Sequence, residues 1–148
     1  MSDEAYRAVF LRVHPTGKMV LSLTTGSDGR EGEYAQLVAG ELGVPPLDVK
    51  VVPADTDRFG TGHGYNESPS DGTPAAIAGA SAKIRDKARL LAGMALEADP
   101  DTLEWANGAW AAGDRFKTIE DIALYAHGTG PLPPGVEGGL DAQTVYRD

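Results

Sequence analysis

The order of predicted elements in the first 53 residues is the feature that most constrains the fold. Residues 5–13 (AYRAVFLRV) and 19–25 (MVLSLTT) are rich in β-branched and aromatic side chains, and the turn residues 14–17 between them predict an antiparallel hairpin. Residues 31–42 place apolar side chains at helical spacing before Gly43, and residues 48–53 predict a third strand. This order predicts an α+β fold, in which a helix packs across an antiparallel or mixed sheet.

The second half of the chain adds a long helix and a small hairpin to this prediction. We expect a helix over residues 74–98, with Thr73 as its N-cap and Pro74 at its first position. Asn107-Gly108 predicts the turn of a hairpin over residues 103–110, and an acidic capping box at Thr118 predicts a helix through His127. The rest is an extended Gly/Pro-rich tail, too poor in apolar residues for a core of its own. We expect residues 1–148 to form a single domain.

Composition and charge exclude several classes of function. The formal net charge of −9 argues against a nucleic-acid partner, because no basic patch offsets the repulsion from phosphates. The absence of cysteine excludes a disulfide scaffold, a thiolate nucleophile and an iron–sulfur cluster held by this chain. No apolar run approaches the roughly 20 residues of a membrane span, and residues 1–8 lack a signal-peptide pattern. We therefore expect a cytoplasmic protein with no membrane span.

The longest stretch without periodicity, residues 54–73, is the best candidate for a functional loop. It contains Gly60-Thr61-Gly62-His63-Gly64, whose alternating glycines expose backbone N–H groups of the kind that bind anions. Tyr65 stands where a dinucleotide-binding fingerprint requires its third glycine, so an anion-binding loop and a flexible surface loop remain open alternatives. The three histidines have no metal-ligand spacing, and we predict no metal site.

Three long segments carry a resemblance to a known family. They are AQLVAGELGVPPLDVKVVPADT, KIRDKARLLAGMALEADPDTLEW and GLDAQTVYRD. With them, residues 5–148 resemble the molybdenum-binding large subunits of the xanthine dehydrogenase/aldehyde oxidase family, and most of all that of aerobic carbon monoxide dehydrogenase. The resemblance implies that this region forms part of the wall around the molybdopterin cofactor.

In that family two loops enclose the cofactor, and the resemblance transfers them to two places in this chain. The first loop, usually Gly-Gln-Gly-His-Glu-Thr, falls on residues 27–32, and the second, usually Gly-Thr-Tyr-x-Ser-Arg-Ser, falls before the long helix. The implied cofactor-binding residues are Asp28, Gly29, Arg30, Gly62, His63, Gly64, Tyr65 and Ser68.

Two departures from the family pattern leave an alternative open. Asp28 replaces an amide that can donate a hydrogen bond with a carboxylate that can only accept. Glu67-Ser68-Pro69 lacks the arginine that would bind a phosphate in a bidentate manner. Both changes oppose binding of a pyrophosphate-bearing cofactor, whereas Arg30 offers a compensating cation. The alternative is a non-enzymatic binding or assembly module on the same fold.

The resemblance also implies that this region is part of a larger, multi-subunit enzyme. In the parent enzyme, an oxidoreductase, the cofactor is molybdopterin of the cytosine dinucleotide type, and iron–sulfur and FAD subunits carry away the two electrons that molybdenum accepts. The family's catalytic base and substrate loop have no counterpart in these 148 residues, so we assign no catalytic residue. The implied partners are the remainder of the large subunit and these two electron-transfer subunits.

Overall fold

The structure, a computed structural model, describes residues 7–24, 29–53, 72–128, 132–133 and 135–146. Within these residues, four strands form the main sheet in the order β3-β2-β1-β7: β1 (Arg7–Val13), β2 (Met19–Leu23), β3 (Val49–Val52) and β7 (Leu140–Tyr146). β1 is antiparallel to both β2 and β7, whereas β2 and β3 are parallel. The sheet is therefore mixed, and the predicted α+β class is confirmed.

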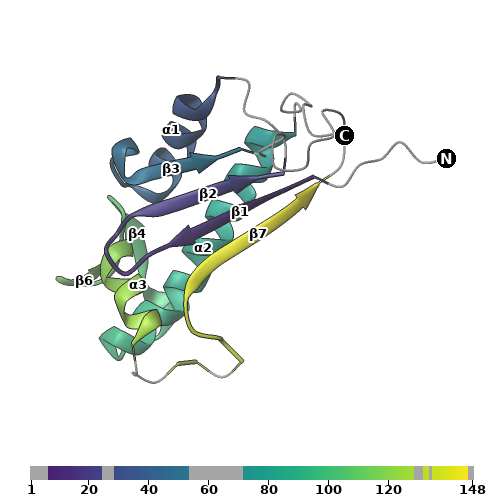
Figure 1. Cartoon of the computed structure of the whole chain (residues 1–148). Helices are drawn as coiled ribbons and strands as arrows, with labels where there is room; N and C mark the ends of the chain where they lie inside the picture. Colours follow the sequence, from purple (N-terminus) through teal and green to yellow (C-terminus); the bar gives the residue numbers. More distant parts are fainter. Residues whose placement is uncertain (1–6, 25–28, 54–71, 129–131, 134, 147–148) are drawn as a thin grey trace.

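Alternation along the strands decides which face of this sheet is buried. Val9, Leu11 and Val13 on β1 are 0% exposed, and Leu21 on β2 is also 0% exposed. These side chains point to the face that α1 (Glu31–Leu42) and α2 (Thr73–Leu96) cover, as Figure 1 shows with both helices behind the sheet. No helix in the described part of the chain covers the opposite face.

Helix α2 forms the centre of the core. Its Ile77, Ile84 and Leu91, seven residues apart, are all 0% exposed, as the predicted apolar stripe requires. It begins one residue earlier than predicted, because Thr73 is its first helical residue and Gly72 occupies the N-cap position. It ends at Leu96, because Glu97 takes the left-handed conformation (φ 54°) and closes the helix two residues before the predicted end.

A second, smaller layer packs below the main sheet. Its strands, in the order β4-β5-β6, are β4 (Glu104–Ala106), β5 (Ala109–Ala112) and β6 (Arg115–Thr118), and α3 (Ile119–His127) follows them directly. Of two short 3-10 turns, η1 (Pro46–Asp48) lies between α1 and β3, and η2 (Pro100–Thr102) lies between α2 and β4. The predicted hairpin and the predicted capping box at Thr118 are both confirmed. Strands β6 and β7 were not predicted.

Two close contacts join this layer to the helices. Trp110 Nε1 donates a hydrogen bond to the Arg85 carbonyl of α2 at 3.0 Å, and the Trp110 ring lies 5.3 Å from that of Trp105 across the hairpin. Gly43, which caps α1 with φ 69°, lies against Gly108 of the hairpin turn, whose φ is 78°. The buried side chains of both layers form one continuous apolar cluster.

Candidate functional site

The two segments that the sequence singles out follow β2 and β3 in the chain, and these two strands end at the same edge of the main sheet. β2 and β3 pair in parallel from Met19↔Val49 to Ser22↔Val52, so both strands finish at the same edge. Figure 1 shows α1 and α2 beginning at the end of the molecule toward which the β2 and β3 arrows point. The carboxyl ends of parallel strands, with helix N-termini beside them, are a common place for ligands. The edge is therefore our candidate site.

The start of α1 presents a cation and an open glycine. Gly29 has φ +81°, and a Cβ added there would meet nothing within 4 Å. Arg30 occupies the N-cap position, is exposed, and makes no ion pair with any described residue. Its carbonyl accepts the first helical hydrogen bond, from Tyr34 N at 2.9 Å. A guanidinium beside the positive end of a 12-residue helix attracts an anion.

Side-chain capping differs between the two ends of the molecule. Arg30 at α1 and Gly72 at α2 make no side-chain cap hydrogen bond. At α3, away from the candidate site, Thr118 Oγ1 accepts from Asp121 N at 3.1 Å and Asp121 Oδ2 accepts from Thr118 N at 3.2 Å. Among the described residues, α3 thus has a side-chain cap from its N-cap residue, which Arg30 and Gly72 do not provide for α1 and α2.

The residues present fit a phosphate-like group at the α1 end. Arg30 can donate to such a group, and the glycine before it lets the backbone approach closely. Glu31 and Glu33 stand in the first turn of α1, where they favour the helix but reduce the local positive charge. Of the predicted site residues, only Gly29 and Arg30 are described. Asp28, Gly62, His63, Gly64, Tyr65 and Ser68 lie outside the described residues.

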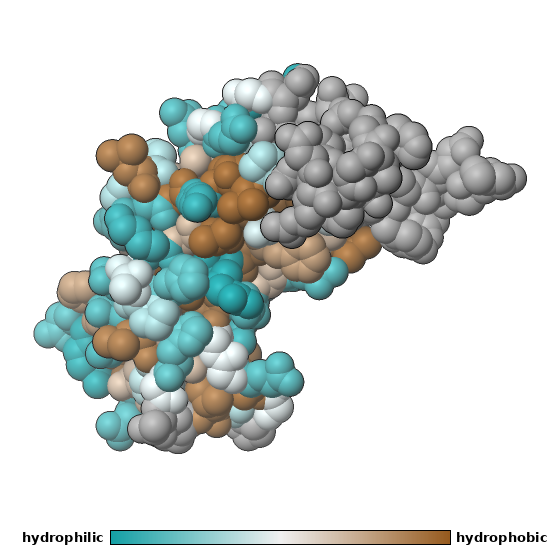
Figure 2. Space-filling view, viewed as in Figure 1, coloured by the Kyte–Doolittle hydropathy of each residue, from teal (hydrophilic) through white to brown (hydrophobic). Residues whose placement is uncertain are grey.

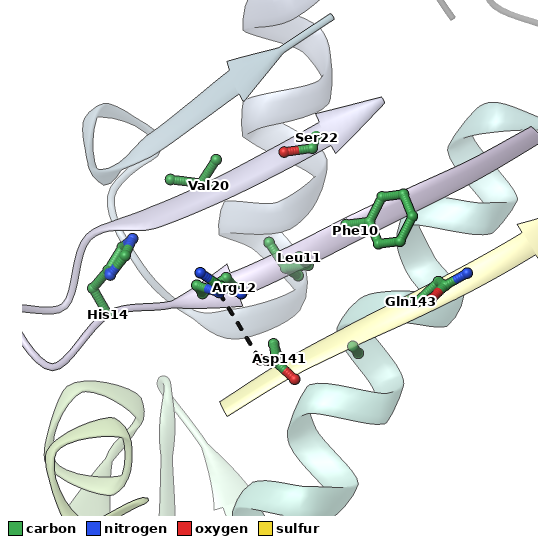
Figure 3. A pocket seen from close by; sticks show the side chains of 9 residues that line it. Phe10, Leu11, Arg12, His14, Val20, Ser22, Asp141 and Gln143 are labelled. Carbon is green, nitrogen blue, oxygen red and sulfur yellow. Dashed lines mark ion pairs between the residues drawn. The ribbon is translucent and has the colours of Figure 1, made fainter. Parts of the chain in front are cut away.

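A second concave region lies on the face of the main sheet opposite to α1 and α2, and sequence reasoning missed it. Its volume is about 710 Å³, and Figure 3 shows Phe10, Arg12, Val20 and Gln143 among the side chains that line it. Arg12 Nε lies 3.9 Å from Asp141 Oδ2, and both side chains are more than half exposed. The sequence signal that could have indicated this region was Phe10. It is an aromatic residue at a position of β1 where the alternation of buried and exposed side chains predicts a solvent-facing, polar residue.

The histidines form no metal centre in the described part of the chain. His14 lies in the β1–β2 turn and His127 at the last residue of α3, and a cavity of about 510 Å³ has both in its lining. No group of three or more His, Asp or Glu side chains among the described residues is placed to hold a metal ion. Likewise, none of the described helices is both long and apolar enough to cross a membrane.

Comparison with known proteins identifies similar sequences and folds. The family described as the molybdopterin cofactor-binding domain matches residues 2–148. The chain is 35% identical over 144 residues to the carbon monoxide dehydrogenase large chain of Afipia carboxidovorans, and 38% identical over 144 residues to that of Hydrogenophaga pseudoflava. Each alignment covers 92% of this chain and 17% of the relative.

A solved structure agrees with these relatives. The crystal structure of Cu,Mo-CO dehydrogenase in its carbon monoxide reduced state superposes with a TM-score of 0.79 at 33% identity, over 95% of this chain and 18% of that chain. The chain therefore spans about a sixth of the length of the relatives that it matches.

Proposed function

The chain belongs to the molybdopterin cofactor-binding domain family, and from this premise we propose that residues 1–148 form one domain of a large subunit like that of carbon monoxide dehydrogenase. In this role the domain provides part of the wall around molybdopterin and is not catalytically complete alone. The proposal draws its support from the match over residues 2–148 and from relatives that extend far beyond the matched segment.

The parallel pairing of β2 and β3 is the observation that carries the assignment of the site. Both proposed cofactor loops, residues 27–31 and 60–73, follow these strands in sequence, although residues 32–59 separate the loops. We propose that Asp28, Gly29 and Arg30 of the first loop, and Gly62, His63, Gly64, Tyr65 and Ser68 of the second, contact the cofactor. Arg30 would bind an anionic oxygen of it, as its exposure at the start of α1 allows.

The remaining parts of the proposed enzyme are those that the family resemblance implies. When bound, the molybdenum centre would accept two electrons from the substrate, and iron–sulfur and FAD subunits would carry them away. We further propose the cytosine dinucleotide form of molybdopterin and a cytoplasmic location. This domain's own contribution is to bind and orient the cofactor through the edge where β2 and β3 end.

A charge reversal at Arg30 tests the proposal. Arg30→Glu, in the assembled large subunit from a host that makes the cofactor, is expected to lower molybdenum and pterin content at least about tenfold, because losing one charge-assisted hydrogen bond costs about 1.5–3 kcal/mol and each 1.4 kcal/mol is about tenfold. Arg115→Glu is the matched control, because Arg115 is also exposed but lies on β6, away from the candidate site. Metal analysis and pterin fluorescence give the two readouts.

The outcomes separate the proposal from its alternative. Full cofactor content in Arg30→Glu would show that Arg30 is not part of the cofactor wall. Equal losses of molybdenum and pterin in Arg30→Glu and Arg115→Glu would indicate a general effect of the added negative charge and not a role of Arg30 at the site. An assembled large subunit that never contains molybdopterin would favour the non-enzymatic binding or assembly module.

A further inference from the structure

The face of the main sheet that no described helix covers gathers exposed apolar side chains. Phe10 is 42% exposed, Val52 38% and Val145 50%, and all three point away from the helices. Val20, half-buried, lies on the same face of β2, diagonal to Phe10 and Val52. Figure 2 shows hydrophobic side chains exposed over the main sheet on the same side of the molecule. We call the outward side chains of this sheet the open sheet face: Phe10, Arg12, Val20, Ser22, Lys50, Val52, Asp141, Gln143 and Val145.

Strand pairing makes these side chains neighbours. Ser22 on β2 pairs with both Phe10 and Val52, and Ala8, which pairs with Val145, is two residues from Phe10 on β1. Directly paired side chains on one face lie about 5 Å apart and diagonal ones about 7–8 Å, which is within contact range of large side chains. The apolar residues are therefore diagonal neighbours and form a strip across all four strands of this sheet, with the polar Ser22 and Gln143 among them.

The other exposed apolar side chains do not gather in this way. Leu47, Phe116 and Leu124 are 96%, 59% and 60% exposed, but they lie on η1, β6 and α3 respectively. Single exposed apolar residues of this kind are ordinary on protein surfaces, whereas a contiguous patch marks an interaction surface. Only the open sheet face, among the surfaces that the structure describes, combines such a strip with a concavity of about 710 Å³.

Charge on the open sheet face differs from that of the chain as a whole. Arg12 and Lys50 stand on the two sides of Val20, and the carboxylate of Asp141 lies beside Arg12. Lys50 makes no ion pair with any described residue. The face is therefore locally cationic, although the chain has a net charge of −9. A complementary surface would be apolar with a carboxylate placed to meet Lys50.

The length of the matched relatives indicates what covers this face. The same fold accounts for 18% of the Cu,Mo-CO dehydrogenase chain, so most of that polypeptide lies outside it. From this we infer that the open sheet face docks another segment of the same large subunit, one that presents an apolar surface with a carboxylate. The inference rests on the proposed function in one respect, namely that residues 1–148 work within a large subunit.

Site-specific cross-linking tests the inference, and two exposed phenylalanines provide a matched pair. Phe10 or Phe116 is replaced by the photo-reactive analogue p-benzoylphenylalanine in the full large subunit, and cross-linked peptides are identified by mass spectrometry. Both positions are exposed on strands, but only Phe10 lies on the open sheet face. We expect the probe at Phe10 to cross-link to large-subunit sequence outside residues 1–148, and the probe at Phe116 to do so with much lower yield.

Four results would overturn the inference. They are a cross-link from Phe10 to a second copy of the chain, to another part of residues 1–148, to an unrelated protein, or no cross-link at all. Cofactor content measured on the same samples keeps the two proposals separate. A cross-link without cofactor would refute the cofactor role alone, and cofactor without a cross-link would refute the docking alone.

Charged substitutions give a second readout. Phe10→Glu with Val145→Glu places two carboxylates on the open sheet face, whereas Phe116→Glu with Leu124→Glu makes the same change elsewhere. The first pair is expected to lower the yield of assembled large subunit about tenfold, because an unpaired charge would be buried at the interface. The urea midpoint of residues 1–148 should be similar in both pairs. Equal assembly yields would contradict the docking.

Discussion

The contact between Gly43 and Gly108 leads to a prediction whose size can be worked from the structure. Gly43 closes α1, and its N–H donates to the Ala39 carbonyl at 2.8 Å. A Cβ added at Gly43 would lie 2.6 Å from Gly108 Cα, closer than real Cβ contacts come, and closer still to Gly108 N. Because the facing atoms are backbone, a rotamer change cannot relieve the overlap. We therefore expect Gly43→Ala to destabilise the protein markedly.

Two terms add up to the expected loss. The left-handed conformation, φ 69° at Gly43, costs an alanine about 1–2 kcal/mol. The overlap with the hairpin turn adds the cost of an overpacked contact, about 1–3 kcal/mol. Gly43→Ala should thus lower the free energy of unfolding by about 2–5 kcal/mol, a large part of the roughly 5–15 kcal/mol typical of a folded domain.

Gly113 provides a control that isolates the second term. Its φ of 68° matches that of Gly43 within a degree, but a Cβ added there would meet nothing within 4 Å. Gly113→Ala should therefore suffer only the conformational cost, and the difference between the two variants measures the overlap, about 1–3 kcal/mol. The gain from a less flexible unfolded chain is common to both variants and cancels.

Urea unfolding followed by the fluorescence of Trp105 and Trp110 gives both free energies. The slope of the free energy of unfolding against urea concentration should stay the same, because the substitutions leave the surface area exposed on unfolding nearly unchanged. A difference of less than about 0.5 kcal/mol between Gly43→Ala and Gly113→Ala would refute the reasoning, because differences of that size are within ordinary surface effects. In a double Gly43→Ala, Gly108→Ala variant, the loss in free energy of unfolding should be smaller than the sum of the losses in the two single variants. The reason is that one movement of the hairpin turn away from the end of α1 relieves both overlaps.

Two further predictions concern polar side chains. Ser81 is 0% exposed and its hydroxyl makes no hydrogen bond to any described residue, so Ser81→Ala should leave the free energy of unfolding unchanged or raise it by up to about 1 kcal/mol. A clear loss of stability in urea would reveal a partner for that hydroxyl. Thr118→Ala should lower the free energy of unfolding by about 1 kcal/mol, because the cap on Asp121 N is lost. Thr16→Ala, in an exposed turn, is the control and should change little.

Local signals in the sequence predicted most of the elements. The helix over residues 31–42 is found with the predicted bounds, because Gly43 supplies the left-handed stop that its position indicated. Asn107 and Gly108 both adopt positive φ, as the predicted hairpin turn requires. These features depend on a few adjacent residues, and adjacent residues are what a sequence shows directly.

Features that depend on distant partners were missed. β7 pairs with β1 from Arg7↔Tyr146 to Val13↔Leu140, and nothing near residues 140–146 indicates this neighbour. Its sequence, LDAQTVY, alternates only weakly, so the tail was expected merely to be extended. The strand is stabilised by its partner and by α2, where a Cβ on Gly79 would come within 3.4 Å of Thr144 Oγ1.

The candidate site was predictable in its parts but not in its arrangement. The segment before residue 31 and the segment before residue 74 each stood out in the sequence, one through the family resemblance and the other also through its glycines. The strands that precede these segments, β2 and β3, end at the same edge because they pair in parallel, which is a property of the sheet. The open sheet face was missed because a strand pattern shows which residues alternate, not whether another element covers them.

The pairing of Arg7 with Tyr146 has a consequence for how this fold is built into a longer polypeptide. Paired residues on antiparallel strands lie only about 5 Å apart, so the backbone enters and leaves the fold at nearly one point. A domain with this geometry can be inserted between two other segments without forcing them apart, and its connections can be cut and rejoined by circular permutation. A fold with this strand pairing is therefore suited to insertion into a longer chain with little change in the path of that chain.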